Sequence, residues 1–220
     1  MGIKENVERI KSLLPEGVIL VAASKSRTPE EILEAHQAGI DIFGENYVQE
    51  LLTKYEKIGN RVEWHFIGHL QRNKVKKIVD VVEMIQTLDN LKLAEELEKR
   101  FSRVDKIIEV LIEVNIAREP QKAGVLPEDV IPFVKEVSER FSYIKIKGLM
   151  TMGPFVDDPE KLRPLFRETK KLFDRIRDMG IKNADMEILS MGMSDSFLIA
   201  MEEGANMVRI GTAIFGKRPY

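Results

Sequence analysis

The sequence predicts a closed (β/α)8 TIM barrel, an α/β fold formed by one chain of 220 residues. Apolar runs of strand length alternate eight times with charged stretches of helical spacing. The runs are almost continuously apolar, which is typical of parallel strands covered on both faces. The length is also ordinary for one such barrel, which takes about 250 residues. We therefore expect a single domain over residues 1–220.

An extra amphipathic helix precedes the repeating units. It is expected over residues 3–14, and Pro15-Glu16-Gly17 ends it because proline and glycine interrupt helical structure. The eight strands are then expected near residues 18–23, 40–43, 63–67, 82–87, 107–114, 144–150, 185–189 and 207–210.

The segments between the strands carry helix signals. Thr28 can accept hydrogen bonds as an N-cap, and Pro29 suits the first turn of the helix that follows. The basic run at 72–77 opens a further helix, and we expect its side chains to be solvated. Other helices are expected over residues 90–103, 127–140, 158–179 and 195–203.

An open, doubly wound sheet is the competing architecture. That fold is expected to carry a glycine-rich phosphate turn after its first strand. Here the corresponding turn reads Ser24-Lys25-Ser26-Arg27 and contains no glycine. The barrel is therefore favoured.

Composition excludes several function classes. The 34 basic and 36 acidic residues leave a formal charge of −2, so no net field attracts nucleic acid or an anionic membrane. The chain has no cysteine, which excludes disulfides, thiolate metal sites and a cysteine nucleophile. His65 and His69 straddle a strand and its turn, so they lack the helical spacing of metal ligands and we predict no metal site.

The N-terminal residues are charged where a signal peptide needs an apolar core, and no stretch approaches the roughly 18 apolar residues of a membrane span. We expect a cytoplasmic protein.

Lys25 follows the first predicted strand directly. A Schiff base requires a neutral amine, and partial desolvation at the end of a buried strand favours that form. The alternative is an ordinary solvated lysine in a βα loop.

Two glycine-bearing turns follow strands seven and eight. TIM barrels commonly bind phosphate through loops at these positions, with backbone N–H groups as donors. Ser194 adds a hydroxyl to the first turn, and Gly211 and Thr212 form the second. The alternative is that both are plain glycine turns.

Other candidate ligand contacts come from strands and rims. Arg209 lies within the last strand and faces opposite to Val208 and Ile210, so its guanidinium needs a phosphate, a carboxylate or a ring nitrogen as a partner. Asn46 and His69 are placed at strand ends where they can touch a ligand.

An amine that shares one rim with a phosphate cradle suits pyridoxal 5′-phosphate (PLP). The same pairing also suits a Schiff-base aldolase acting on a phosphorylated sugar, and a barrel with a vestigial site is a third interpretation.

Six ordered motifs resemble those of the pyridoxal phosphate homeostasis protein family, which is also described as alanine racemase N-terminal-domain-like, and the resemblance covers essentially the whole chain. The motifs are Ala22-Ala23-Ser24-Lys25, the segment 43–50, the segment 64–71, Gly148-Leu149-Met150-Thr151-Met152, the segment 189–194 and the segment 208–216.

The resemblance implies a fold-type III PLP barrel that binds PLP as an aldimine of Lys25. It implies phosphate contacts from Ser194, Gly211 and Thr212, and a place for Arg209 near the ring nitrogen or the phosphate. It also implies a monomer that acts in PLP homeostasis or delivery without an established catalytic reaction, with apo PLP-dependent enzymes as candidate partners.

A PLP-dependent racemase-like enzyme is the alternative function. Related barrel racemases carry a second, β-rich domain, whereas this chain stops four residues after Gly216, so we expect it to lack that domain. Two-sided proton transfer needs a positioned group on each face of the cofactor. We therefore expect a carrier with no catalytic residue.

Overall fold

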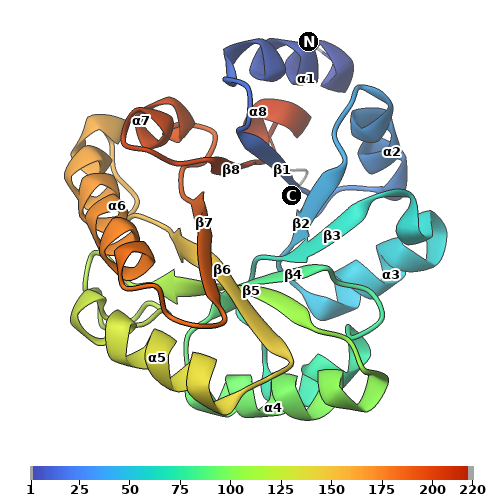
Figure 1. Cartoon of the computed structure of the whole chain (residues 1–220). Helices are drawn as coiled ribbons and strands as arrows, with labels where there is room; N and C mark the ends of the chain where they lie inside the picture. The colour runs from blue at the N-terminus through green and yellow to red at the C-terminus, as the bar shows by residue number, and fades with distance from the viewer. Residues whose placement is uncertain (1, 218–220) are drawn as a thin grey trace.

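A computed structural model describes residues 2–217 of the chain. Eight parallel strands close into a barrel in sequence order, with the first strand paired to both the second and the last. Figure 1 shows the strands inside a ring of helices, as the sequence predicted. The strands are β1 (Ile19–Ala23), β2 (Ile42–Glu45), β3 (Glu63–Phe66), β4 (Met84–Leu88), β5 (Ile108–Val114), β6 (Ile144–Thr151), β7 (Ala184–Ser190) and β8 (Met207–Ile210).

The α-helices follow the expected alternation. They are α1 (Ile3–Leu13), α2 (Pro29–Gln37), α3 (Val48–Ile58), α4 (Leu91–Phe101), α5 (Val130–Arg140), α6 (Arg163–Asp178), α7 (Phe197–Glu202) and α8 (Thr212–Phe215). Short 3-10 helices occur at Gly59–Arg61, Arg72–Lys77, Ser102–Val104, Pro127–Asp129 and Pro159–Leu162.

Helix α2 begins as its sequence predicts. The Thr28 hydroxyl accepts a hydrogen bond from the Glu31 amide, and the Glu31 carboxylate accepts one from the Thr28 amide. This reciprocal capping box satisfies two amides that the first helical turn leaves without partners. Pro29 occupies the first turn, where its missing N–H costs nothing.

The extra helix α1 packs beside the short helix α8, and the two lie next to each other in Figure 1. Asn6 donates a hydrogen bond to the Ile214 carbonyl at 2.9 Å, and Val7 and Ile10 are fully buried. α1 therefore covers a part of the barrel that the four-residue α8 is too short to cover.

Two expected helices differ from the structure. The run Arg72–Lys77 forms only a 3-10 helix, because buried Val75 and Ile78 hold it against the barrel and a β-branched stretch follows. Its basic side chains are exposed, as expected. α7 begins at Phe197 rather than Asp195, because the Ser196 hydroxyl accepts from the Met193 amide and holds a turn there.

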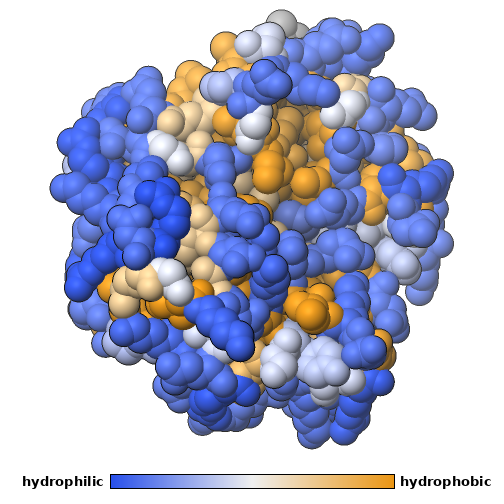
Figure 2. Space-filling model, in the orientation of Figure 1, coloured by the Kyte–Doolittle hydropathy of each residue, from blue (hydrophilic) through white to orange (hydrophobic). Residues whose placement is uncertain are grey.

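The apolar core has two parts. The larger part lies between the strands and the surrounding helices, and a smaller cluster fills the inside of the barrel. Figure 2 shows hydrophilic residues over most of the periphery, with hydrophobic residues between them toward the centre of the view. Among residues 2–217, no helix has the length and apolar character needed to cross a bilayer. The barrel-interior cluster consists of Val21, Met84, Leu111, Met150, Ile188 and Met207.

Candidate functional site

The Lys25 amine lies at the carboxyl rim of the barrel and has no oxygen partner within the described residues. The side chain is partly buried in the turn after β1. Its Nζ atom lies 4.9 Å from the centroid of the Tyr47 ring, a residue that follows β2. An aromatic face attracts the amine without accepting its protons as strongly as a carboxylate does. Lys25 is therefore held at the rim and remains available to a ligand.

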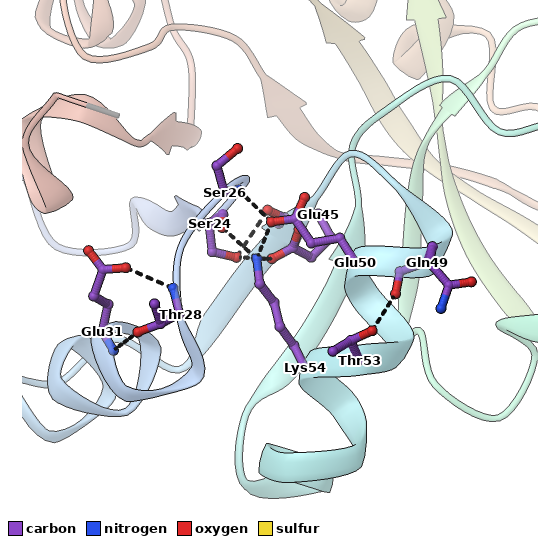
Figure 3. Close-up of polar contacts among 10 residues, drawn as sticks. Ser24, Ser26, Thr28, Glu31, Glu45, Gln49, Glu50, Thr53 and Lys54 are labelled. Atoms are coloured by element: carbon purple, nitrogen blue, oxygen red, sulfur yellow. Dashed lines mark hydrogen bonds and ion pairs between the residues drawn. The ribbon is translucent and has the colours of Figure 1, made fainter. Parts of the chain in front are cut away.

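A buried polar cluster fixes the turn that carries Lys25 (Figure 3). The Lys54 ammonium donates to the Ser24 carbonyl at 2.7 Å, to Glu45 at 2.5 Å and to Glu50 at 2.7 Å. The Ser24 hydroxyl donates to Glu45, and the Ser26 amide donates to Glu50. These contacts bracket Lys25 on both sides. We call Ser24, Glu45, Glu50 and Lys54 the β1-turn cluster.

The β1-turn cluster places charges in a water-poor setting. Glu45 and Lys54 are both buried. Burial raises the pKa of Glu45 above its ordinary value, while the Lys54 charge and the hydrogen bonds from Lys54 and Ser24 oppose that rise. Ser26 adopts a φ of 62°, a left-handed conformation that costs free energy for a residue with a Cβ atom. The hydrogen bond from its amide to Glu50 helps to hold that conformation.

The loops after β7 and β8 lie side by side at the same rim. The Ser194 hydroxyl accepts from the Ala213 amide at 3.1 Å, and the Arg209 amide donates to the Gly192 carbonyl at 3.1 Å. Within residues 2–217, the backbone N–H groups of Ser194, Gly211 and Thr212 have no hydrogen-bond partner. Unpaired amides from two adjacent loops can serve an anion.

Glycine is required at the first turn and allows a close approach at the second. Gly192 has a φ of +96°, and a Cβ there would lie 2.6 Å from the Ala200 Cβ. A Cβ on Gly211 would lie 3.1 Å from the Ala23 carbonyl oxygen. This close approach also shows that the β8 loop touches the end of β1, in line with the pairing of Ala22 with Ile210. Lys25 and Gly211 therefore share one mouth of the barrel.

Arg209 lies inside the barrel near its carboxyl rim and is almost fully buried. Its Nη1 donates to the Ser190 hydroxyl at 2.6 Å and its Nη2 to the Thr151 carbonyl at 3.0 Å. Burial lowers the pKa of Arg209 to about 10, while the negative charge of Glu113 opposes that shift. No carboxylate within the described residues lies within ion-pair distance of the guanidinium, so the neutral partners leave its charge for a ligand.

A cavity of about 470 Å³ opens at the carboxyl rim above β2 to β7. Asn46 and His69 line it. The other predicted site residues are outside its lining, namely Lys25, Ser194, Arg209, Gly211 and Thr212. The cavity wall is largely apolar and comes from the loops after six strands. Its lining also includes Ile67, Thr87, Glu113, Asn115, Lys122, Met152, Phe155, Met193 and Ser196.

Among the titratable groups that line this cavity, Glu113 has the most strongly shifted pKa. Burial and the negative charge of Asp89 raise the pKa of Glu113 to about 7, with Arg209 acting in the opposite direction. The Glu113 side chain has no hydrogen-bond partner within residues 2–217. A carboxyl group with this pKa exchanges its proton near neutral pH.

Sequence reasoning missed three of these residues for different reasons. Glu50 and Lys54 are four apart on a helix, which normally indicates a solvated ion pair. Glu113 lies in an apolar strand, and this burial of an acidic residue was the signal that could have identified it.

The chain is similar in sequence to known proteins. A family model described as the N-terminal domain of alanine racemase matches residues 2–219. The pyridoxal phosphate homeostasis protein of Aquifex aeolicus is 44% identical over 202 residues, which cover 91% of this chain and 87% of that protein.

Solved structures agree with these sequence matches. PipY of Synechococcus elongatus PCC7942, solved with PLP bound, has a TM-score of 0.89 and 30% identity, covering 97% of this chain and 100% of its own. An alanine racemase of Clostridium difficile 630 has a TM-score of 0.81 and 17% identity, covering 100% of this chain and 57% of its own. The latter likeness concerns the fold alone.

Proposed function

This chain belongs to the pyridoxal phosphate homeostasis protein family, within the alanine racemase N-terminal-domain group, and on that premise we propose that it binds PLP reversibly for PLP homeostasis or delivery. The observation that carries the proposal is the unpaired Lys25 amine, which shares a rim with the free amides of Ser194, Gly211 and Thr212. In this proposal the protein acts as a cytoplasmic monomer, and apo PLP-dependent enzymes receive the cofactor.

The residues of the rim fit the chemistry of PLP. PLP supplies an aldehyde that condenses with a primary amine, together with a phosphate and an aromatic ring. Lys25 would provide the amine. Its nitrogen would form a C=N bond to the aldehyde carbon, and the aldehyde oxygen would leave as water with the two amine protons. The backbone amides of the β7 and β8 loops would bind the phosphate. Asn46 adds a polar contact from the cavity wall.

Arg209 favours storage of the cofactor over catalysis. We place its guanidinium near the ring nitrogen or the phosphate. A cation beside the ring nitrogen disfavours protonation of that nitrogen, and an unprotonated ring is a poorer electron sink. The relatives in this family are named for homeostasis rather than for a reaction, which supports the same conclusion.

Racemase-like chemistry is the second candidate, and Glu113 is the observation that favours it. With a pKa of about 7, its carboxyl group could exchange protons with a ligand in the cavity at neutral pH. Racemisation also needs a second group on the opposite face of the ligand. Sustained turnover of an amino acid, abolished by Lys25→Ala, would replace the carrier proposal with this one.

Absorption spectroscopy tests the proposed function. We expect added PLP to give the wild type a visible Schiff-base band, and borohydride reduction to leave a pyridoxyl adduct on Lys25. Lys122→Ala is the matched control, because Lys122 lines the neighbouring cavity and forms an ion pair with Glu119. The control should keep the band and Lys25→Ala should lose it. A band that survives Lys25→Ala, or an adduct on another lysine, would overturn the proposal.

Delivery needs a separate measurement. The PLP-loaded protein is mixed with an apo PLP-dependent enzyme, and the recovery of that enzyme's activity is compared with recovery from an equal concentration of free PLP. A carrier should restore activity while protecting PLP from added free amines. Failure to restore any activity would restrict the protein to storage.

A further inference from the structure

A continuous chain of hydrogen bonds runs through the inside of the barrel. Arg209 Nη1 lies 2.6 Å from Ser190 Oγ, which lies 2.7 Å from Gln86 Oε1. Gln86 Nε2 lies 3.0 Å from His65 Nδ1, and His65 Nε2 lies 2.9 Å from Glu63 Oε1. We call these five residues the interior relay.

The interior relay spans most of the barrel from one end to the other. Glu63 is the first residue of β3, so it lies at the amino end, and its side chain is 45% exposed. Ser190 is the last residue of β7, so it lies at the carboxyl end where Arg209 is held. The intervening His65 and Gln86 are buried. A solvent-exposed carboxylate at one end is thereby connected to the guanidinium at the other.

Its two ends set the direction of every bond in the relay. Arginine can only donate and an ionised carboxylate can only accept. The hydrogen bond from His65 holds the pKa of Glu63 below its ordinary value, which keeps that carboxylate ionised near neutral pH. Ser190 therefore donates to Gln86, Gln86 donates to His65 Nδ1, and His65 carries its proton on Nε2.

Gln86 has a partner for each of its polar positions. Its Nε2 atom also lies 3.3 Å from the Met207 sulfur, toward which the second amide proton points. Turning this amide over would put its NH2 group against Ser190 and its oxygen against the His65 nitrogen lone pair. With His65 in its neutral form, the relay therefore has one self-consistent arrangement, which in turn gives the Ser190 hydroxyl one orientation.

Folding alone does not explain the interior relay. An apolar cluster packs around the relay inside the barrel, and buried polar groups can often be replaced by apolar residues of similar volume at little cost in stability. What the relay does supply is a fixed hydroxyl acceptor for Arg209 on one side, with the Thr151 carbonyl on the other. Two acceptors on different strands fix both the position and the plane of the guanidinium.

We propose that Gln86 and His65 are positioning residues of the cofactor site, which act through Ser190 to hold the Arg209 guanidinium in the plane that a bound ligand meets. Arginine has five N–H donors, and the two bonds to Ser190 and Thr151 leave the others for a ligand. The inference rests on the proposed function in one respect, namely that Arg209 faces PLP.

The first test uses the protein without cofactor, so it is independent of the proposed function. In 15N NMR spectra of the wild type, we expect His65 to carry its proton on Nε2 alone and the Arg209 guanidinium to give resolved, slowly rotating N–H signals. Gln86→Leu should mix the two His65 tautomers and average the Arg209 signals. Met84→Leu is the matched control, because Met84 fills the same interior and takes no part in the relay.

The second test measures PLP binding. We expect Gln86→Leu to raise the PLP dissociation constant about tenfold and to shift the absorption maximum, because a hydrogen bond to a charged group is weakened. Met84→Leu should bind within about twofold of the wild type. Ser190→Ala, which removes a single oxygen, should match Gln86→Leu and serves if the latter does not fold.

The outcomes separate the two proposals. A wild type that forms no Lys25-dependent band contradicts the proposed function, while the NMR arm still tests the relay. Arg209 signals and PLP affinity that are the same in Gln86→Leu, Ser190→Ala and Met84→Leu would overturn the positioning role. An affinity loss of equal size in Met84→Leu would also overturn it, because general disturbance of the core would then explain the result.

Discussion

Lys25 and Lys54 lie close to the same strand end, yet their surroundings give them opposite roles. Lys54 is buried, and its ammonium donates to a backbone carbonyl and to two carboxylates. Lys25 is partly exposed, and its amine lies over the face of Tyr47 without a hydrogen bond or ion pair among residues 2–217. An ammonium whose three protons are all bonded is stabilised as a cation and is a poor nucleophile. Residue type and proximity to the strand end therefore do not distinguish the two lysines, whereas the hydrogen-bond acceptors around each amine do, and they favour Lys25 as the proposed Schiff-base lysine.

The carboxylates show the same contrast. Glu45 accepts from Lys54 and Ser24 and belongs to the β1-turn cluster. Glu113 lines the cavity without a side-chain partner among residues 2–217. The cluster uses its charges to hold the backbone, whereas the cavity keeps a proton-exchanging group accessible to a ligand.

Replacement of Lys54 should have the largest effect on stability. Lys54→Met keeps most of the apolar stem but leaves Glu45 buried without its cation, so we expect the free energy of unfolding to fall by about 3–5 kcal/mol. Denaturant titration measures this change. In Lys54→Met/Glu45→Gln the unpaired charge is also removed, and part of the loss should be recovered. A single variant as stable as the wild type would show that the cluster does not hold the turn.

Replacement of Glu113 should change how stability depends on pH. The raised pKa, about 7 against 4.5 for an ordinary glutamate, means that the native state keeps a proton the unfolded chain has already lost. The associated stability is present at low pH and is lost as pH rises through about 7. Since one pKa unit corresponds to about 1.4 kcal/mol, Glu113→Gln should be more stable than the wild type above about pH 8, by up to about 3 kcal/mol.

Thermal unfolding from about pH 4 to pH 9 tests this prediction. The difference between Glu113→Gln and the wild type should grow between about pH 4.5 and pH 7 and then level off, because both the folded and the unfolded wild type have lost the proton above that range. A constant difference would show that Glu113 titrates at an ordinary pKa.

The contact between Lys25 and Tyr47 should contribute modestly. An exposed cation–π pair is worth about 0.5–1 kcal/mol, and Tyr47 is 55% exposed. A double-mutant cycle with Tyr47→Leu and Lys25→Met isolates the coupling from other effects of each substitution. Coupling above about 2 kcal/mol would place Lys25 among the structural lysines and weaken the contrast with Lys54.

Replacement of Lys25 should have the smallest effect on the fold. The side chain makes no hydrogen bond or ion pair within the described residues and loses only its contact with Tyr47, so the free energy of unfolding of Lys25→Ala should lie within about 1 kcal/mol of the wild-type value. The same variant is expected to lose the Schiff-base band entirely. A destabilisation close to that of Lys54→Met would mean that its loss of PLP binding reports damaged structure rather than a missing amine.

The alternation of apolar and charged segments in the sequence was sufficient to predict the barrel and most of its elements. Strands read from apolar runs match the observed ones closely, and the Thr28 capping box formed where expected. The prediction of a regular helix at Arg72–Lys77 was wrong, because this segment forms a 3-10 helix. Burial of its apolar residue against the barrel outweighed the local helical preference. Predictions from short sequence motifs are therefore correct where the interacting residues are close in sequence, as Thr28 and Glu31 are in the capping box.

The cofactor site was predictable in part. Lys25 and the β7 and β8 loops share the predicted rim, since parallel strands of a barrel end at one mouth. Asn46 lines the cavity at the same rim, and its contact with a cofactor stays a prediction. The roles predicted for the individual site residues remain predictions that the proposed spectra address. Lys54 and Gln86 were not identified, because their partners include residues 9 to 121 positions away. Glu113 was not identified, because its raised pKa depends on burial and on the charges of Asp89 and Arg209.

By itself, the sequence determined the closed barrel, the family and the placement of an amine near two glycine turns, because periodicity and motifs are local and parallel strands share an end. The tertiary structure alone decided which lysine is paired with carboxylates among residues 2–217, which carboxyl groups have a raised pKa and which polar residues reach Arg209. The physical reason is that hydrogen-bond partners and burial set the cost of a charge, and both arise only when distant segments of the chain meet.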